Sequence, residues 1–304
     1  MVVENFYSQI ASSNKKVSRI ILGMASSPYV DGTEQNNLLD EIFAKGITAF
    51  DTARQYRNSE ECLGKWMFSR KNRQDVFVLT KCAHPFADGK GRLTKKDIRS
   101  DAEDSLKELK TDYIDALMLH RDDASVPVGE VVEWCNELIR EGLILSYGCS
   151  NWKVGRIAAA NEYARSRNMI PFALSSPHFS LAEQFHDPWG GGCVTITGAK
   201  QKGERDWYRA SGMPVVAYSS LGRGIFSGKV EDDISAKAAL DHFAYLGYGH
   251  EKNYERARRC KQLAKQKGVS AAQIALSWVF HSGMNVFAVI GSSSVVRMDE
   301  NIRS

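Results

Sequence analysis

The sequence predicts an α/β fold, a (β/α)8 TIM barrel, and three observations carry that prediction. Eight short apolar or β-branched runs are spaced through 304 residues, and helical patterns lie between them. Most runs are apolar throughout rather than alternating, as expected of parallel strands buried on both faces. No low-complexity linker or break in composition divides the chain. We therefore expect one domain over residues 1–304, with right-handed crossovers; an open doubly wound sheet is the alternative.

The eight predicted strands follow one another at roughly even intervals along the chain. They comprise residues 17–22, 47–52, 76–80, 114–119, 145–149, 172–174, 214–218 and 286–290. Helix-start patterns lie between several of them, namely Asn58 with Glu61, Thr94 with Asp97, and Ser270 with Gln273. Residues 97–109 repeat their apolar positions at helical spacing. Residues 268–296 carry no charged side chain but several polar ones, which predicts a buried helix and strand rather than a membrane span.

Charge and cysteine content exclude several classes of protein. The 40 Lys and Arg against 36 Asp and Glu leave a net charge of +4, too small an excess for a dedicated nucleic-acid binder. The closest two of six cysteines, Cys135 and Cys149, are fourteen residues apart, so no C-x-x-C redox or zinc pattern exists. Residues 1–16 lack the apolar core of a signal peptide. We expect a cytoplasmic protein with free thiols and no metal, membrane or nucleic-acid partner.

Polar side chains end several predicted strands, where a (β/α)8 barrel places its active site. Asp51 ends the second run, Lys81 follows the third and His120 the fourth, while Tyr56 lies five residues after Asp51. A tyrosine hydroxyl titrates near pH 10, and an adjacent ammonium lowers that pKa by stabilising the phenolate. The carboxylate fixes the lysine, and the histidine orients a substrate oxygen. Such a set predicts proton delivery to a carbonyl oxygen that gains charge as hydride adds.

Six motifs, in order along nearly the whole chain, resemble those of the aldo-keto reductase superfamily. They are residues 51–56 (DTARQY), 79–81 (LTK), 117–121 (LMLHR), 147–151 (YGCSN), 217–224 (AYSSLGRG) and 290–301, with its Gly-Ser-Ser, Arg297 and Glu300-Asn301. The resemblance is to a bacterial-type or channel-beta-subunit-like branch rather than to the aldose reductase branch. It implies a barrel that reduces an aldehyde or ketone with NADPH bound outside any Rossmann domain.

The resemblance also implies a role for each matching residue. Tyr56 would be the general acid, Lys81 and Asp51 would tune it, and His120 would orient the carbonyl. The nicotinamide would be held by Ser150, Asn151 and Ser176, and the ring of Tyr218 would stack on it. The implied pyrophosphate contacts are Ser219, Leu221, Gly222 and Lys229, and those of the adenosine end are Gly291, Ser293, Arg297, Glu300 and Asn301. Arg297 suits a 2′-phosphate, because a guanidinium binds phosphate with two parallel hydrogen bonds, and this favours NADP(H) over NAD.

Two departures from the family pattern concern the cofactor. Ser175-Ser176 stands where Asn-Gln is common, so that Ser176 reaches a carboxamide poorly, and Ser220 replaces the usual proline.

Residues 186–208, with three consecutive glycines, predict a long irregular loop, either a surface excursion or a lid over the substrate. We expect His178, His186 and His242 on the surface or in substrate loops.

Two alternative functions stay open at this point. An NADP(H)-binding sensor or accessory subunit with little turnover uses the same barrel, although the complete set of Asp51, Tyr56, Lys81 and His120 argues against it. A barrel isomerase or lyase would use Lys81 as a Schiff base, which a neighbouring Asp51 disfavours by keeping the amine protonated. The predicted partner is a small carbonyl compound. Neither its identity nor the oligomeric state follows from the sequence.

Overall fold

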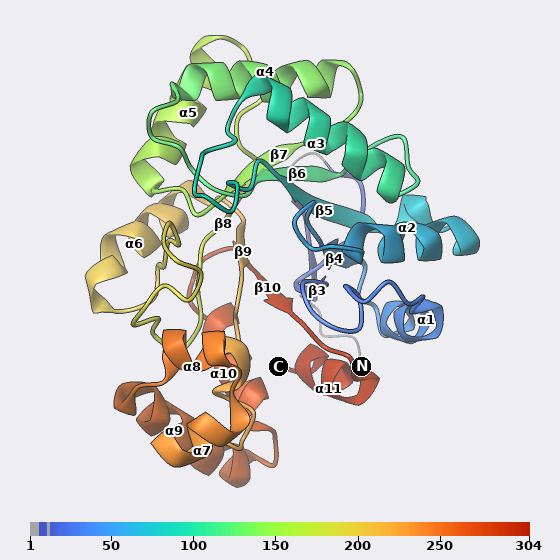
Figure 1. Cartoon of the computed structure of the whole chain (residues 1–304). Coiled ribbons are helices and arrows are strands. Elements are labelled where there is room, and N and C mark those ends of the chain that lie inside the picture. The colour runs from blue at the N-terminus through green and yellow to red at the C-terminus, as the bar shows by residue number, and fades with distance from the viewer. Residues whose placement is uncertain (1–5, 11–12) are drawn as a thin grey trace. The chain divides into compact units, whose positions relative to one another are not determined.

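The computed structural model describes residues 6–10 and 13–304. Its eight parallel strands form a closed barrel in the order β10-β3-β4-β5-β6-β7-β8-β9, so the predicted (β/α)8 fold class is confirmed (Figure 1). The contacts within the chain divide it into two compact units, each described here by itself. The first runs to Ser176 and includes Gly291–Val295, and the second contains Pro177–Ile290 and Val296–Ser304. That the chain is one domain stays a prediction.

The first unit contains six of the barrel strands and their helices. Its strands are β1 (Tyr7–Ser8), β2 (Val17–Ser18), β3 (Ile20–Gly23), β4 (Ala49–Asp51), β5 (Phe77–Cys82), β6 (Ala116–Leu119), β7 (Tyr147–Ser150) and β8 (Leu174–Ser176). The first predicted strand is divided in two, because β2 pairs antiparallel with β1 and only β3 enters the barrel. All residues of β3–β8 are buried, as their apolar sequences predict.

The register of β4, β5 and β6 brings the predicted catalytic strands together. Asp51 is the partner of Leu79 in β5, and Lys81 is the partner of Met118 in β6. Because side chains alternate between the two faces of a strand, Lys81 points to the same side of β5 as Leu79. Asp51 and Lys81 therefore project from neighbouring strands at the same end of the sheet.

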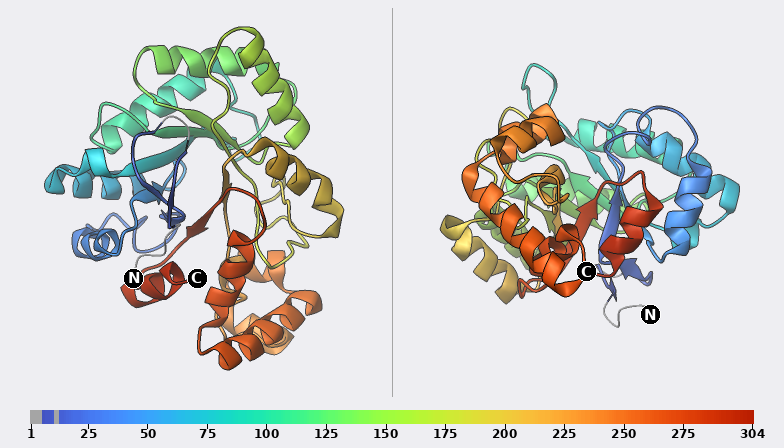
Figure 2. Two further views of the ribbon diagram at one scale, coloured as in Figure 1. Left: turned by 180° about the vertical axis from the view of Figure 1, so that it is seen from behind. Right: turned by 90° about the horizontal axis from the view of Figure 1, so that it is seen from below.

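Helices cover the outside of these strands, as Figures 1 and 2 show. They are α1 (Asn36–Ala44), α2 (Ser59–Arg70), α3 (Lys95–Glu108), α4 (Val128–Arg140) and α5 (Val154–Ser166), with a 3-10 turn at Arg73–Asp75. In α4, Val131, Cys135 and Leu138 are buried at a spacing of four and three residues, which places them on one face. Thr94 begins α3 as predicted, and its side chain accepts a hydrogen bond from the Asp97 backbone.

The second unit contains strands β9 (Val215–Ala217) and β10 (Val286–Ile290), which pair in parallel. Its helices are α6 (Lys202–Ser211), α7 (Asp233–Ala239), α8 (His242–Tyr248), α9 (Glu251–Lys267) and α10 (Ala271–Phe280). Two 3-10 turns occur at Ala199–Gln201 and Gly222–Gly224, and α11 (Val295–Ile302) begins at the boundary between the units. The predicted capping box of Ser270 and Gln273 begins α10, and the helix-then-strand prediction for residues 268–296 is confirmed.

The prediction of a long loop over residues 186–208 is wrong for its last third. Helix α6 begins at Lys202 and continues to Ser211, while residues before Ala199 are irregular. Tyr208 is the one buried residue of α6, so the helix offers almost no apolar periodicity to the sequence. Arg205 stabilises it by donating hydrogen bonds from its side chain to the carbonyls of Ile196 and Gly198.

Candidate active site

A buried ion pair joins the ends of β4 and β5. The Lys81 Nζ atom lies 2.6 Å from the Asp51 Oδ1 atom and also donates a hydrogen bond of 2.9 Å to the Thr52 carbonyl. Both charged residues are about 5% exposed or less. Burial is the largest single influence and acts to lower the pKa of Lys81, but the charges of Asp51 and Tyr56 and the hydrogen bonds to them together outweigh it, and the pKa is raised. Lys81 is therefore an ammonium at neutral pH, as the sequence argument requires.

Tyr56 lies in the β4–α2 connection beside that ammonium. The Lys81 Nζ atom is 4.8 Å from the centre of the tyrosine ring. We expected Lys81 to lower the pKa of the phenol, and its charge does act in that direction. Burial has the larger effect, however, and the pKa of Tyr56 is raised above its ordinary value. The hydroxyl therefore carries its proton at neutral pH, the form that a general acid needs.

His120 follows β6 and completes the group. Its ring centre is 5.7 Å from that of Tyr56, and the two planes meet at 83°. Burial first, then the charge of Lys81, lowers the pKa of His120 well below its usual value, so the imidazole is neutral. Its Nδ1 atom is buried and has no hydrogen-bond partner among residues 6–10 and 13–304. Nε2 is therefore the ring nitrogen left to contact a substrate.

Further hydrogen bonds and an ion pair hold the β4–α2 connection against β5. Glu60 is fully buried and accepts a 2.6 Å hydrogen bond from the Thr80 hydroxyl. Its other oxygen lies 2.8 Å from the Arg54 guanidinium, and the Thr52 hydroxyl donates to Ser59. These contacts fix both ends of the segment that carries Tyr56, so they position its ring relative to Lys81.

The ends of β7 and β8 bring together three of the residues predicted for the nicotinamide. The Ser150 hydroxyl donates a 3.0 Å hydrogen bond to the Ser176 carbonyl, and the Asn151 amide donates to the Ser150 hydroxyl at 3.0 Å. The same amide lies 3.5 Å from the His120 carbonyl. Asn151 has a φ of 62°, a left-handed conformation that asparagine tolerates better than most residues. All three are at most 5% exposed.

In the second unit, a tight loop follows β9 and carries the residues predicted for the pyrophosphate. Positive φ values recur at Ser219, Gly222, Arg223 and Gly224. The Gly222 N–H donates a hydrogen bond of 2.7 Å to the Ser219 carbonyl. Successive backbone N–H groups in such conformations form concave anion sites, which fits a phosphate. Ser220 replaces the family's proline, and its hydroxyl donates a hydrogen bond of 2.8 Å to the Val289 carbonyl of β10. Leu221 is partly buried in this loop.

Two further predicted cofactor residues of this unit are accessible. Tyr218 is partly exposed, and its ring lies 5.9 Å from that of Trp189, edge to face. Lys229 is exposed, and its ammonium forms no ion pair within the described part of the chain. Both groups can therefore meet a ligand from solvent.

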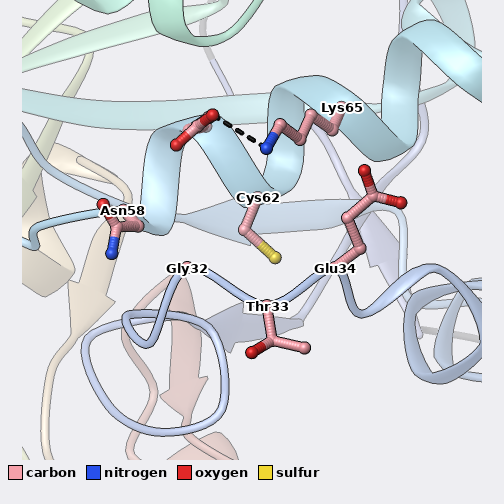
Figure 3. Close-up of a pocket in the computed structure, with 7 residues that line it drawn as sticks. Gly32, Thr33, Glu34, Asn58, Cys62 and Lys65 are labelled. Carbon is pink, nitrogen blue, oxygen red and sulfur yellow. Dashed lines mark ion pairs between the residues drawn. The ribbon is translucent and has the colours of Figure 1, made fainter.

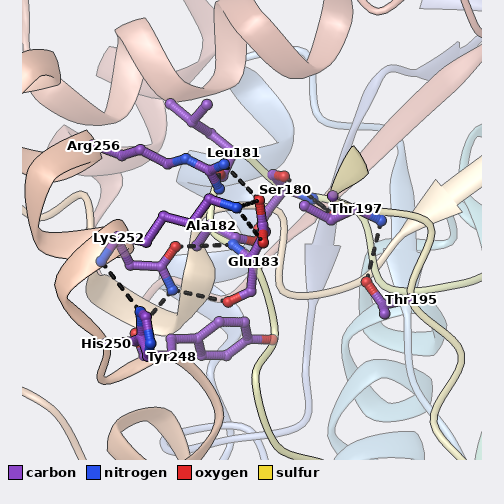
Figure 4. A network of polar contacts seen from close by, with 12 residues as sticks. Ser180, Leu181, Ala182, Glu183, Thr195, Thr197, Tyr248, His250, Lys252 and Arg256 are labelled. Atoms are coloured by element: carbon purple, nitrogen blue, oxygen red, sulfur yellow. Dashed lines mark hydrogen bonds and ion pairs between the residues drawn. The ribbon is translucent and has the colours of Figure 1, made fainter. Parts of the chain in front are cut away.

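A polar network supports residues 177–197, the segment that follows β8. Glu183 lies 2.7 Å from Lys252 and 2.6 Å from Arg256, and Asn253 donates to the Glu183 carbonyl (Figure 4). Burial acts to raise the pKa of Glu183, but the hydrogen bonds from the two cations hold it below its usual value. Arg256 also donates a hydrogen bond to the Leu181 carbonyl, so residues 181–183 are held against α9.

His178 is not on the surface, so that alternative of the prediction is wrong; it lies in the segment after β8, and a place in a substrate loop stays a prediction. Its side chain is fully buried, with Nδ1 2.8 Å from the Thr195 hydroxyl and Nε2 3.2 Å from the Ser180 hydroxyl. The hydrogen bonds of those two hydroxyls explain why a histidine is stable in this interior position. His186 and His242 are exposed, as predicted.

The predicted adenosine contacts divide between the two units. Gly291 and Ser293 are exposed in the segment that belongs to the first unit, where the Tyr29 hydroxyl donates to the Ser292 carbonyl. Arg297 and Glu300 are exposed on α11, which the second unit contains almost entirely. Asn301 is only 5% exposed, so it does not share their accessible face.

A small pocket in the first unit is separate from these groups. It comprises about 160 Å³ of empty space, part of it open to solvent, between residues 32–34 and the start of α2, and the Cys62 thiol points toward that segment (Figure 3). Lys65 and Glu61 form a 2.8 Å ion pair at its edge. The pocket is smaller than typical ligand sites, and none of the predicted catalytic residues lines it.

No group of three or more His, Cys, Asp or Glu side chains in residues 6–10 and 13–304 is arranged to hold a metal ion. Over the same residues, no helix combines the length and apolar character that crossing a membrane requires.

Sequence reasoning missed one residue that contacts the predicted catalytic group and gave no role to another. The ring of His84 lies 4.7 Å from that of His120, and Arg121 directly follows His120. His84 escaped notice because it lies beyond the end of β5, three residues after Lys81. Extending the inspection of strand ends into the following loops would have found both.

Comparison with known proteins gives a family match and named relatives. The model of the aldo/keto reductase family matches residues 19–304. A norsolorinic acid reductase of Aspergillus flavus is 29% identical, over 98% of this chain and 76% of its own length. A protein of Glycine max named probable aldo-keto reductase 1 is 30% identical, over 97% of this chain and 82% of its own length. An aryl-alcohol dehydrogenase of Pestalotiopsis microspora is 26% identical, over 88% of this chain and 67% of its own length.

Proposed function

We propose that this chain, which belongs to the aldo/keto reductase family, is an NADPH-dependent reductase of aldehydes or ketones with Tyr56 as its general acid. Family membership and the names of the relatives establish an oxidoreductase that acts on carbonyl compounds, in a family that generally uses a nicotinamide cofactor. The observation that supports the finer proposal is the protonated phenol of Tyr56 beside the Lys81 ammonium, which Asp51 holds at 2.6 Å.

The proposed mechanism follows from these protonation states. The substrate's carbonyl oxygen accepts hydrogen bonds from the Tyr56 hydroxyl and from Nε2–H of the neutral His120. A bound reduced nicotinamide supplies the hydride that adds to the carbonyl carbon. As negative charge develops on the oxygen, the Tyr56 proton moves to it, and the product is an alcohol. The phenolate left on Tyr56 is stabilised by Lys81, whose charge lowers the pKa of the phenol against the opposing effect of burial.

Residues of each unit fit parts of the cofactor. In the first unit, the buried Ser150, Asn151 and Ser176 offer the polar atoms that a carboxamide requires. In the second unit, the left-handed backbone from Ser219 to Gly224 and the exposed Lys229 suit a pyrophosphate. We propose that Tyr218 stacks on the nicotinamide and that the exposed Arg297 binds the 2′-phosphate. Asn301 would contribute through the backbone or by holding α11, since its side chain is buried.

The test compares Tyr56→Phe with Tyr163→Phe, a control in α5 whose hydroxyl contacts Glu133. NADPH oxidation is followed with a panel of benzaldehydes, because relatives include an aryl-alcohol dehydrogenase. We expect Tyr56→Phe to lower kcat by about 10²–10⁴-fold while the Kd for NADPH changes little, since general acid catalysis contributes that factor. The control retains wild-type kinetics. Turnover preserved in Tyr56→Phe would refute the assignment of the acid.

The cofactor preference has its own test in Arg297→Leu. We expect the variant to raise the KM for NADPH and to leave that for NADH unchanged, because only NADPH carries the 2′-phosphate. An equal effect on both cofactors would contradict the proposed contact. Wild-type protein that binds NADPH but reduces no member of the carbonyl panel would favour a sensor over an enzyme.

A further inference from the structure

His84 lies just after the end of β5, in direct contact with the proposed catalytic group. Its ring centre is 4.7 Å from that of His120, and the two planes meet at 83°. Tyr56 contacts the same imidazole, with ring centres 5.7 Å apart. The backbone N–H of His120 also donates a hydrogen bond of 2.9 Å to the Cys82 carbonyl, which ties the end of β6 to the segment that carries His84. His84 is partly exposed, so a ligand held by His120 can reach it.

The hydrogen bond of one ring nitrogen fixes the protonation of the other. The Nδ1 atom of His84 lies 2.9 Å from the Pro85 carbonyl oxygen, and since a carbonyl only accepts, Nδ1 carries the proton. Burial is the largest influence on the pKa of His84 and lowers it, as do the charges of Arg121 and Arg92, against the opposing effect of the Pro85 hydrogen bond. At neutral pH the ring therefore holds that one proton. Nε2 is left as an acceptor, and it has no hydrogen-bond partner within residues 6–10 and 13–304.

The backbone that carries His84 is held in an unusual conformation. Ala83 has a φ of 57°, in the left-handed region that alanine seldom adopts. Its N–H donates a hydrogen bond of 2.8 Å to the Asp101 carboxylate of α3, and Arg92 lies 2.8 Å from the other oxygen of that carboxylate. A strained residue of this kind persists where its surroundings hold it, and such residues gather at ligand sites. The position of the imidazole is therefore determined before any ligand binds.

The charged side chains of the loop after β5 leave the Nε2 atom of His84 unoccupied. Arg92 is paired with Asp101 at 2.8 Å. Asp88 accepts a hydrogen bond from the Lys90 backbone, and both residues are exposed. What His84 offers at this point is a neutral acceptor, and the group that complements it is a neutral donor.

We propose that the Nε2 atom of His84 accepts a hydrogen bond from a hydroxyl group on the carbonyl substrate. The inference rests on the proposed reductase function and names its substrate class, aldehydes and ketones that carry a hydroxyl close to the reacting carbonyl. In that mechanism Tyr56 and His120 both donate hydrogen bonds to the carbonyl oxygen, and His84 supplies an acceptor beside them. Because the centres of the two imidazoles are 4.7 Å apart, a substrate only a few atoms long spans both. A ribose hydroxyl or the carboxamide of the cofactor has the same donor chemistry, and the experiment distinguishes these sources.

The test uses three ketones of similar shape: hydroxyacetone, methoxyacetone, which keeps the oxygen without its proton, and 2-butanone, in which a methyl replaces the hydroxyl. His84→Phe keeps a planar ring that can pack against His120 but removes the acceptor. We expect it to lower kcat/KM for hydroxyacetone by about 3–10-fold, the usual contribution of one neutral hydrogen bond, and to change that for the other two ketones less than about twofold. His84→Gln, whose amide oxygen can accept, recovers part of the loss. The matched control is His281→Phe, because the exposed His281 also donates Nδ1–H to a backbone carbonyl, that of Ser277.

Two other kinetic outcomes would overturn the proposal. Equal losses on all three ketones would mean that His84 only holds the ring of His120. A weaker affinity for NADPH in His84→Phe, with unchanged discrimination among the ketones, would assign the acceptor to the cofactor instead.

Failure of the proposed function is recognised separately, because the benzaldehydes would then not be reduced either. If none of the three ketones is reduced, saturation-transfer NMR compares their binding to wild-type protein and to His84→Phe. A preference for hydroxyacetone that the variant loses supports the proposal. Equal binding of hydroxyacetone and methoxyacetone by wild-type protein, or a preference that the variant retains, refutes it.

Discussion

The buried imidazole of His178 should make the stability of this protein depend on pH in a way that one substitution removes. Burial lowers the pKa of His178 from 6.5 to about 3. The hydrogen bonds explain why the neutral form is fixed. Ser180 donates its hydroxyl proton to the Ala182 carbonyl, so it accepts from Nε2–H, and Nδ1 accepts from Thr195. A second proton on Nδ1 would displace the Thr195 bond at a fully buried position.

The magnitude follows from linkage. Between pH 6.5 and 3 the unfolded chain binds a proton at this position and the folded chain does not, so stability falls as the pH falls. With these two pKa values, the loss is about 2 kcal/mol at pH 5 relative to pH 8, and about 5 kcal/mol below pH 3. His178→Gln removes the titration. The difference in unfolding free energy between wild type and variant should therefore shrink by about 2 kcal/mol from pH 8 to pH 5.

The assay is urea unfolding followed by tryptophan fluorescence and circular dichroism at pH 8, 7, 6 and 5. Titrations of other groups are common to both proteins and cancel in the difference. His242→Gln, which alters an exposed histidine of the same unit, is the control and should leave the pH profile unchanged. A wild-type-minus-variant difference that is constant across the pH range would refute the reasoning. Because His178 lies 5.7 Å from Tyr218, loss of its packing should also weaken cofactor binding.

Four further predictions concern the buried Asp51–Lys81 ion pair and the helices. Lys81→Met should destabilise the fold by about 3–5 kcal/mol, because it leaves Asp51 buried and unpaired, and the double variant with Asp51→Asn should recover part of that loss in urea unfolding. Gly64→Ala should cost at least about 1–3 kcal/mol, since its Cβ would lie 2.2 Å from a backbone carbonyl of α3. Gly155→Ala, in α5, has open space around the added carbon and should instead stabilise by about 0.5–1 kcal/mol; thermal melts that rank the two alike would contradict this. Ser270→Ala removes the capping box of α10 and should cost about 1 kcal/mol by the same melts.

Some features of the site were predictable because they depend on local sequence. Asp51, Lys81 and His120 each end or follow an apolar run, and parallel strands bring such ends to one edge of the barrel. The pairing of Asp51 with Lys81 then follows from the adjacency of β4 and β5. The direction of the pKa of Tyr56 does not follow from sequence. It depends on how much surrounding protein displaces water from the hydroxyl, which outweighs the nearby ammonium.

Other features depend on loops whose paths no short-range pattern determines. The sequence does not predict the burial of His178, which two hydrogen-bonding partners, Ser180 and Thr195, make possible; the Ser180 hydroxyl in turn donates to the Ala182 carbonyl. Helix α6 was missed because only Tyr208 is buried in it, and its stability comes from tertiary contacts such as those of Arg205.

By itself, the sequence determined the order of eight strands and helices, the barrel class, and the strand ends at or near which the proposed acid, its lysine and the histidine lie. These properties arise from the periodicity and length of apolar runs, which are local. Only the tertiary structure decided that His84 packs against His120 and that Glu183 pairs with Lys252 and Arg256. The reason is physical: the position of a loop side chain and the pairing of a charge depend on residues distant in sequence, and packing alone brings those residues together.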